Sequence, residues 1–430
     1  MLCLLAQTVM AELNARKLLL FYEEQLYGDI LPFWLKNGID KEYGGYFTCF
    51  TNTSEELLSD DKYIWSQARF IWVLSRLAAL EGGKGEYLGL ARSGVRFLQE
   101  NALLENGNCA FLLDRRGNPK EPVPGSGYDT SFYADCFAIL GFAEYARISG
   151  ERGALDFALK VYDSVIRRLQ AKSIRTEPYP IPRGLKTHGV PMIMVNTCDE
   201  LSKALDEFGH LRTHEVKEMS LHYTHEIISD FTTEDDLILE MVREDGEEID
   251  SILGTYINPG HTIEDMWFII HCAQRYGDSE LIKRAARIVK RTMEVGWDTK
   301  YGGLFLFVNR DGGEPQGDIG GFEDDEMVRK LKNDWDNKLW WPHSEALYST
   351  LLSYNLTKDK GLAELYNKVH HYTFAAFPNP DKQIGEWIQI RDRQGRPETK
   401  VVALPVKDPF HIARSFMLII ELLRGSSGDF

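Results

Sequence analysis

The hydrophobic and polar positions of this 430-residue chain repeat with a helical period over most of its length. Apolar residues that recur at i, i+3, i+4 and i+7 line one face of an α-helix. In the first half the pattern predicts helices at residues 11–36, 63–81, 85–101, 130–149, 152–170 and 189–208. In the second half it predicts helices at residues 212–231, 260–276, 279–295, 342–356, 360–376 and 409–424. We therefore expect twelve helices that follow one another as six pairs.

Short segments with a different pattern lie between the helix pairs. Their apolar and polar residues alternate and end in a glycine-containing turn, which is typical of a strand followed by a tight turn. Five of these segments resemble one another, at residues 41–50, 105–117, 235–246, 298–312 and 384–395. We expect each to form a small β-hairpin. One wider gap holds an acidic insertion near residues 314–334.

Six helix pairs can stack as an open solenoid or close into a ring. A solenoid usually keeps a strict consensus, whereas these repeats are strongly diverged and carry different rare residues at equivalent positions. The pattern therefore favours an all-α fold, a closed (α/α)6 barrel (toroid) of twelve helices with short β-hairpins in the loops. Because no linker-like tract divides the chain, we predict a single barrel domain over residues 1–430.

Composition and charge restrict the partners. A formal net charge of −16 opposes binding to nucleic acid and to anionic lipid surfaces, which depend on clustered Lys and Arg. No stretch approaches the ~20 apolar residues of a membrane span. We therefore expect no nucleic acid and no membrane among the partners.

The first residues of the chain and its cysteines indicate the cellular compartment. Residues 1–11 are apolar but lack a basic start, so we expect the beginning of a helix rather than a secretion signal. The six cysteines are scattered and contain no CxxC pair, which indicates neither a disulfide framework nor a zinc site. Both observations favour a cytoplasmic protein.

Chemically reactive residues gather near the predicted starts of the even-numbered helices. The segments are WSQARFIW at 65–72, NPGHTIEDMW at 258–267, KLWWPHSEAL at 338–347 and FHIARSF at 410–416. In a closed barrel these helix starts face one mouth, where their partial positive charges favour an anion. Arg69 would add a permanent positive charge there, although an ion pair with a neighbouring acid would also explain this residue.

The NPGHTIE segment places His261 and Glu264 on one face of a helix, with Trp267 on the same stripe. A nearby carboxylate can orient an imidazole and raise its basicity. His261 is therefore a candidate acid–base group, and a satisfied core histidine is the alternative. His411 lies at the start of the last helix, which would stand beside the second helix across the ring.

The KLWWPHSEAL segment places Trp341 and Glu345 four residues apart. The tryptophans either pack in the core or form a flat wall for a sugar ring, with polar contacts from His343 and Glu345. No HExxH motif is present, and the phosphate-binding patterns GxGxxG and GxxxxGK[ST] are missing too. We expect no metal and no cofactor.

A pocket of this kind suits general acid–base catalysis, because histidine can both accept and return a proton near neutral pH. Removal of a proton from the carbon next to a carbonyl creates an enediolate. Arg69 and the helix starts could stabilise its negative charge.

These motifs resemble those of the N-acylglucosamine 2-epimerase family, which also includes cellobiose 2-epimerases and related aldose isomerases. WSQAR, NPGHTIE with its following Trp, KLWWPHSEAL and FHIAR carry the resemblance, together with YGGYFTC at 43–49. It extends from about residue 20 to 420. The resemblance implies an (α/α)6 barrel and a cofactor-independent inversion at C2 of an open-chain sugar.

The resemblance also implies roles for individual residues. His261 and His411 would be the acid–base groups on opposite faces of C2, and Arg69 would hold the enediolate oxygens. Glu264 and Glu345 would orient the histidines or assist ring opening. The expected substrate contacts are Trp65, Trp267, Trp341, His343, Met192 and Asn196.

The segment KTHGVPMIMVN at 186–196 resembles the acylglucosamine branch of the family. Met192 lies where the disaccharide epimerases carry a histidine that contacts substrate. We therefore expect interconversion of N-acetylglucosamine and N-acetylmannosamine. The alternatives are mannose epimerisation, mannose–fructose isomerisation, cellobiose or mannobiose epimerisation, hydrolysis of glycosides by two carboxylates on the same fold, and a non-catalytic toroid that binds a protein.

The resemblance makes a homodimer plausible. Nucleotide activation occurs in some relatives, but no phosphate-binding loop indicates it here.

Overall fold

The computed structural model describes residues 13–83, 85–399 and 405–425. The expected helix start within residues 1–11 lies outside these ranges. None of the helices in the described ranges combines the length and the apolar character that crossing a membrane requires.

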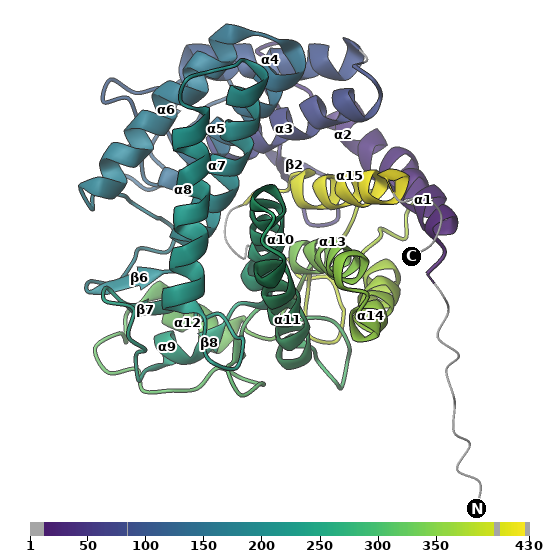
Figure 1. The fold of residues 1–430 in the computed structure, drawn as a ribbon. Helices are drawn as coiled ribbons and strands as arrows, with labels where there is room; N and C mark the ends of the chain where they lie inside the picture. Colours follow the sequence, from purple (N-terminus) through teal and green to yellow (C-terminus); the bar gives the residue numbers. More distant parts are fainter. Residues whose placement is uncertain (1–12, 84, 400–404, 426–430) are drawn as a thin grey trace, which may run out of the picture.

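Six helices form an inner ring (Figure 1). Each packs against the next, and α15 packs against α3, so the ring is closed. In order they are α3 (Ile64–Leu80), α5 (Phe132–Ser149), α7 (Gly189–Glu207), α10 (Pro259–Tyr276), α13 (Trp340–Thr357) and α15 (Phe410–Gly425). The predicted (α/α)6 barrel is therefore confirmed.

An outer helix covers each inner one. The outer helices are α1 (Ala15–Glu24), which continues as the π-helical η1 (Gln25–Ile30) and α2 (Leu31–Asn37), α4 (Gly85–Asn101), α6 (Arg152–Gln170), α8 (Thr213–Glu226) with η2 (Ile227–Phe231), α11 (Ser279–Gly296) and α14 (Lys360–Ala376). All twelve predicted helices are present, with ends within a few residues of the prediction.

Inner and outer helices differ in how they are buried. In α5 nearly every residue from Phe132 to Ala146 is buried, because neighbours surround the helix on all sides. In α11 burial recurs along one stripe that includes Ala285, Ile288, Val289 and Met293, since the other face meets solvent. The hydrophobic pattern therefore distinguishes the two layers.

A local antiparallel bridge occurs at each of the five predicted hairpin segments, and regular strand pairs are added to these bridges. The bridges are Ile39–Tyr46, Leu103–Cys109, Thr232–Ile238, Trp297–Leu304 and Pro378–Trp387. Two pairs are local: β1 (Cys49–Phe50) with β2 (Leu57–Ser59), and β4 (Leu112–Leu113) with β5 (Pro119–Lys120). The other strand pairs are long-range: β3 (Lys62–Tyr63) with β4, β6 (Leu185–Thr187) with β7 (Met241–Arg243), β8 (Tyr256–Ile257) with β9 (Val308–Asn309), and β10 (Lys338–Leu339) with β11 (Ile390–Arg391). In each long-range pair, the strand before an inner helix joins the strand after the following outer helix.

This long-range pairing fixes where the inner helices begin. The start of α5 follows the same scheme through a single bridge between Ser131 and Thr176. At the start of α15, the backbone N–H of Lys407 donates to the carbonyl of Thr48 at 2.6 Å, which joins the last repeat to the first. Local alternation predicted the strands but contained no information about these distant partners.

The acidic insertion contains a helix that the sequence pattern did not predict. The helix α12 (Glu326–Asn333) begins after Asp325, whose carboxylate accepts from the backbone N–H groups of Met327 and Val328. It packs with the short α9 (Ile252–Thr255) in a small second core that includes Leu253 and Leu331. Eight residues are too few to show a clear helical period.

Candidate active site

The predicted catalytic residues all lie in the first two turns of inner helices. Arg69 is on α3, His261 and Glu264 are on α10, Glu345 is on α13, and His411 is on α15. The side chain of Asn258 caps α10 by accepting from the backbone N–H of His261 at 3.2 Å. Because these helices are neighbours around the ring, their reactive residues meet at the N-terminal mouth of the barrel.

His411 lies in a buried ionic cluster. Its Nδ1 is 2.8 Å from Glu345 Oε1 and 3.4 Å from Nη2 of Arg414, a residue that the sequence reasoning missed. Glu345 Oε1 also accepts from Arg414 at 2.6 Å, and its Oε2 accepts from the indole N–H of Trp267 at 2.8 Å. Arg414 also donates to Glu264. Glu345 is therefore held in place from three directions.

The environment of His411 favours a neutral imidazole. Burial lowers the pKa of His411 to about 3, with Arg69 and Arg414 acting in the same direction and Glu264 opposing them. A carboxylate can only accept a hydrogen bond, so the short contact with Glu345 places the ring proton on Nδ1. Nε2 is then left with a free lone pair, as a general base requires.

His261 lies at the end of a chain of hydrogen bonds. Its Nδ1 is 3.0 Å from Glu240 Oε2, Glu240 Oε1 is 3.2 Å from His188 Nδ1, and His188 Nε2 is 2.9 Å from Asp265 Oδ2. Pairing of β6 with β7 brings Glu240 beside His188, whose backbone N–H donates to the Glu240 carbonyl at 2.9 Å. The sequence reasoning missed Glu240, His188 and Asp265.

Within this chain of hydrogen bonds, His188 and Glu240 form a charged pair. Burial by itself would lower the pKa of His188, but its bonds to Asp265 and Glu240 outweigh burial and raise the pKa to about 9. Burial would raise the pKa of Glu240, yet the neighbouring His261 and His188 hold it at about 2. The ionised Glu240 accepts the Nδ1 proton of His261 and leaves Nε2 of His261 free, as Nε2 of His411 is.

Glu264 does not contact His261, the nearest histidine on its own helix. The structure pairs it instead with Arg414 and places it 3.8 Å from His411. The role that the resemblance implies for Glu264, orienting a histidine or assisting ring opening, stays a prediction. The carboxylate of His261 is Glu240, which lies 21 residues earlier in the chain.

The indole of Trp341 lies close to both His261 and His411. Its ring centroid lies 5.6 Å from that of His261 and 5.5 Å from that of His411. The indole packs on the first turn of α10, where a Cβ at Gly260 would come within 2.4 Å of it. The glycine of the NPGH motif is therefore needed for this close approach.

Arg69 has an aromatic surround and one acidic partner. Its guanidinium lies 4.1 Å from the ring centroid of Phe137 and 4.9 Å from those of Trp65 and Phe410. Its Nη1 is 3.4 Å from Asp408, so the alternative of an ion pair is also present. Among the described residues, this single long contact leaves most of the five guanidinium N–H groups without a strong acceptor.

His343 does not join the cluster, in contrast to the expectation of a substrate contact. It is fully buried, its Nδ1 lies 2.6 Å from the Leu339 carbonyl, and its Nε2 accepts from the backbone N–H of Leu304 at 2.9 Å. Burial lowers its pKa to about 3. Both ring nitrogens therefore bind backbone and link the start of α13 to a neighbouring loop.

Of the other expected contacts, Met192 lies in the first turn of its helix, whereas Asn196 and Trp267 lie deeper in the barrel. Met192 is buried in the first turn of α7, at an exposure of 7%. Asn196 and Trp267 line a cavity of about 230 Å³ among the later turns of the inner helices. The sequence thus placed at one mouth residues that the structure distributes along the depth of the barrel.

Two residue sets have spacings suited to a metal ion, namely His188, Glu240 and His261, and Glu264, Glu345 and His411. The guanidinium of Arg414 contacts both carboxylates of the second set, and a second cation there would be repelled. In the first set, a doubly protonated His188 has no free lone pair. The donors present do not fit a metal well, and the expected absence of a metal stays a prediction.

The sequence model of the N-acylglucosamine 2-epimerase (GlcNAc 2-epimerase) family matches residues 45–415. The chain belongs to this family. An N-acylglucosamine 2-epimerase of Mus musculus is 29% identical over 93% of this chain and 90% of its own. A cellobiose 2-epimerase of Bacteroides fragilis is 22% identical over 85% of this chain and 89% of its own.

A solved structure, described as a sugar epimerase from a ruminal bacterium, superposes with a TM-score of 0.76 at 18% identity. The alignment covers 95% of this chain and 99% of that one, and it shows the shared fold. The predicted family and the predicted enzyme class, a carbohydrate epimerase and thus an isomerase, are confirmed.

Proposed function

We propose that this protein is a cofactor-independent sugar 2-epimerase that interconverts N-acetylglucosamine and N-acetylmannosamine. The observation that carries the proposal is the pair His261 and His411, whose ring centroids lie 5.6 and 5.5 Å from that of Trp341. Each binds a carboxylate through Nδ1, and neither Nε2 has a hydrogen-bond partner among the described residues. Two bases that face one flat wall can approach a sugar carbon from opposite sides.

The reaction begins with the open-chain aldehyde. One imidazole takes the proton from C2 through Nε2, and the C2–H electron pair moves towards the carbonyl to form an enolate, which is an enediolate for a 2-hydroxy sugar. Arg69 stabilises the negative oxygen. The other imidazole, protonated at Nε2, returns a proton to the opposite face of C2 and inverts it.

The protonation states must then be restored. Each turnover leaves the first imidazole protonated and the second neutral. The side chain of His261 is 36% exposed and that of His411 is 7% exposed, so His261 is the group with direct access to solvent protons. The reset therefore requires that the imidazole that took the C2 proton releases it and that the other imidazole takes one up, and His261 can do its part by direct exchange with water.

The substrate assignment rests on two observations. The mammalian relative named above as an N-acylglucosamine 2-epimerase is more similar to this chain than the cellobiose 2-epimerase is. At the position of Met192 a thioether offers only a weak acceptor, which gives little support to a second sugar ring. Both observations favour an N-acylated monosaccharide over a disaccharide.

Incubation of candidate sugars in heavy water tests the proposal. The panel is N-acetylglucosamine, N-acetylmannosamine, glucose, mannose and cellobiose, and the measurement is ¹H NMR of the products. We expect inversion with solvent deuterium at C2 of both N-acetylhexosamines. Ketose formation would indicate an isomerase instead, a new reducing end from cellobiose would indicate a hydrolase, and no change in any sugar would contradict catalysis.

We also propose a cytoplasmic location. Cys49, Cys109, Cys136, Cys198 and Cys272 carry free, buried thiols, which a reducing compartment preserves. The homodimer stays a prediction, as does independence from nucleotides.

A further inference from the structure

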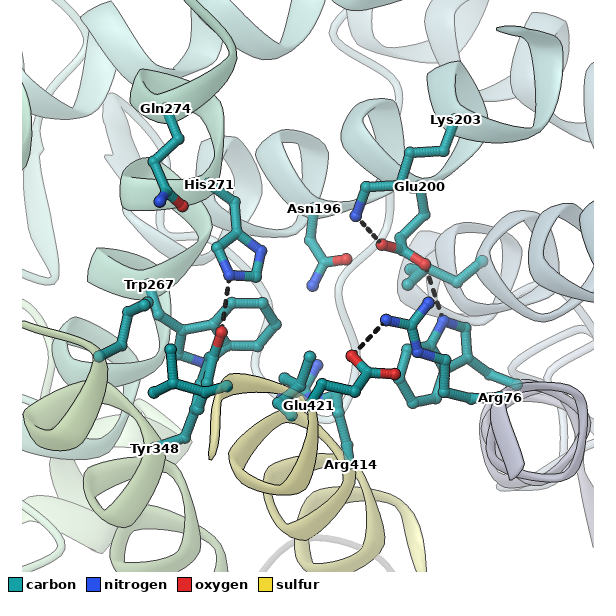
Figure 2. Close-up of a pocket in the computed structure, with 15 residues that line it drawn as sticks. Arg76, Asn196, Glu200, Lys203, Trp267, His271, Gln274, Tyr348, Arg414 and Glu421 are labelled. Atoms are coloured by element: carbon teal, nitrogen blue, oxygen red, sulfur yellow. Dashed lines mark hydrogen bonds and ion pairs between the residues drawn. The ribbon is translucent and has the colours of Figure 1, made fainter. Parts of the chain in front are cut away.

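The cavity of about 230 Å³ is lined by side chains from the later turns of the inner helices, among them Arg76, His271 and Glu421 (Figure 2). Trp267 and Arg414 line it, and both also bind Glu345 on their other side. These two side chains separate the cavity from His411. A molecule in the cavity is therefore distinct from the sugar at the N-terminal mouth.

The charged side chains that line the cavity are all paired within the protein. Arg76 binds Glu421 at 2.5 Å, and Lys203 binds Glu200 at 2.6 Å. Glu200 also accepts from the indole N–H of Trp72 at 2.9 Å. Arg414 is held by Glu345. Because each charge already has a partner of opposite sign, the cavity offers no net attraction to an ion.

Uncharged polar side chains also line the space, among them Asn196 and His271. Asn196 is 5% exposed, and its amide has no hydrogen-bond partner within the described residues. Figure 2 shows this amide extending between His271 and Glu421. His271 contacts the Tyr348 hydroxyl at 2.8 Å, and burial lowers its pKa to about 4, which keeps the ring neutral. Amides and neutral imidazoles both donate to and accept from hydroxyl groups.

Flat aromatic groups complete the walls. Trp72, Trp267 and Tyr348 contribute rings, and Gln274 stands exposed among the lining residues on the last turn of α10. Aromatic walls with a few convergent polar groups are typical of small-molecule sites. We propose that this cavity binds a second, uncharged, polyhydroxylated small molecule of the monosaccharide class.

Binding stoichiometry tests this proposal in the full chain. The His411→Asn variant serves as the background because it prevents turnover, and equilibrium dialysis with labelled N-acetylglucosamine counts bound molecules. In this background, Gln274→Trp places a large side chain at the entrance, and we expect it to remove one equivalent of bound sugar. Gln170→Trp, on the exposed end of the outer helix α6, is the matched control and should remove none.

The difference between the two variants is the criterion, so the test does not depend on sugar binding at the catalytic mouth. A fall from two equivalents to one supports the cavity, and so does a fall from one to none. Sorbitol, an uncharged polyol, should compete for the lost equivalent, whereas glucose 6-phosphate should compete at least tenfold more weakly. Equal stoichiometry in both variants, or equal competition by the phosphate, would overturn the proposal.

Discussion

The surroundings of His261 and His411 reach the same chemical state by different means. In both, a buried carboxylate binds Nδ1 and leaves Nε2 free. The charge of Glu345 is balanced by the guanidinium of Arg414, and the charge of Glu240 by the imidazolium of His188. Arginine keeps its charge at every physiological pH, whereas histidine can lose it. The comparison shows that each of these buried carboxylates is paired with a buried cation, and that the kind of cation decides how its surroundings respond to pH.

The largest effect should come from removing either imidazole. We expect His261→Asn and His411→Asn each to lower the rate of C2 inversion about 10³-fold, because each variant lacks one of the two proton carriers. Each variant should still exchange deuterium into the one epimer whose C2–H faces the surviving histidine. The measurement is ¹H NMR in heavy water, with each epimer incubated separately.

The two variants serve as controls for one another. The epimer that exchanges in His261→Asn should be the one that fails to exchange in His411→Asn. If both variants exchanged the same epimer, the histidines would not lie on opposite faces of C2.

Replacement of Glu345 and of Glu240 should show how the surroundings of His411 and His261 differ in their effect on stability. We expect Glu345→Gln and Glu240→Gln each to lower kcat about 10²-fold, since the Nδ1 proton loses its negatively charged acceptor. Glu345→Gln should also lower the free energy of unfolding by about 3 kcal/mol, because Arg414 keeps its buried charge. Glu240→Gln should lower the free energy of unfolding by less, since His188 can release its proton.

Urea denaturation at pH 7 measures this difference in stability. An equal loss of unfolding free energy in the two variants would contradict the idea that His188 limits the loss by releasing its proton.

The pH dependence of stability should reveal His188. Its pKa is raised from the ordinary value near 6.5 to about 9, so its contribution is fully present below pH 6.5 and is lost as the pH rises through 9. We expect the difference in free energy of unfolding between the wild type and His188→Gln to shrink by up to roughly 3 kcal/mol from pH 6 to pH 9.5. Denaturation of both proteins at the two pH values is the measurement.

The pKa of His411 is shifted in the opposite direction, so its effect on stability depends on pH in the opposite way. Its pKa is lowered to about 3, so the unfolded chain binds a proton that the folded chain does not, and stability falls as the pH drops from 6.5 towards 3. A His411→Asn variant should therefore lose less stability on acidification than the wild type. The same slope in both proteins would refute the buried neutral state of His411.

The smallest effect on catalysis should follow His343→Gln. The residue binds two backbone groups away from the mouth, so kcat and KM should stay within about twofold. The free energy of unfolding should fall by about 1–3 kcal/mol, because buried backbone groups lose their partners. Steady-state kinetics and urea denaturation check both values, and a tenfold rise in KM would restore His343 as a substrate contact.

Much of the fold could be predicted from the sequence because helices have a local period. The positions of His261 and His411 were predictable as well, since helix starts carry local signals such as the Asn-Pro-Gly turn at 258–260. Arg414 could have been found from its spacing, because it lies one turn after His411 on the same helix. No comparable local signal marks Glu240, which lies just before a three-residue strand.

The sequence by itself determined the twelve helices, the closed ring and the family, because periodicity and helix-start motifs are properties of neighbouring residues. Only the tertiary structure decided which charge faces which. Asp265 belongs to the same helix as His261 yet binds His188, 77 residues away, while Glu345 binds His411 across 66 residues. Such contacts depend on the packing of separate helices and on strand pairing between distant segments. A hydrogen bond of about 3 Å between residues far apart in the sequence produces no repeating pattern of residue types, so the sequence alone does not reveal it.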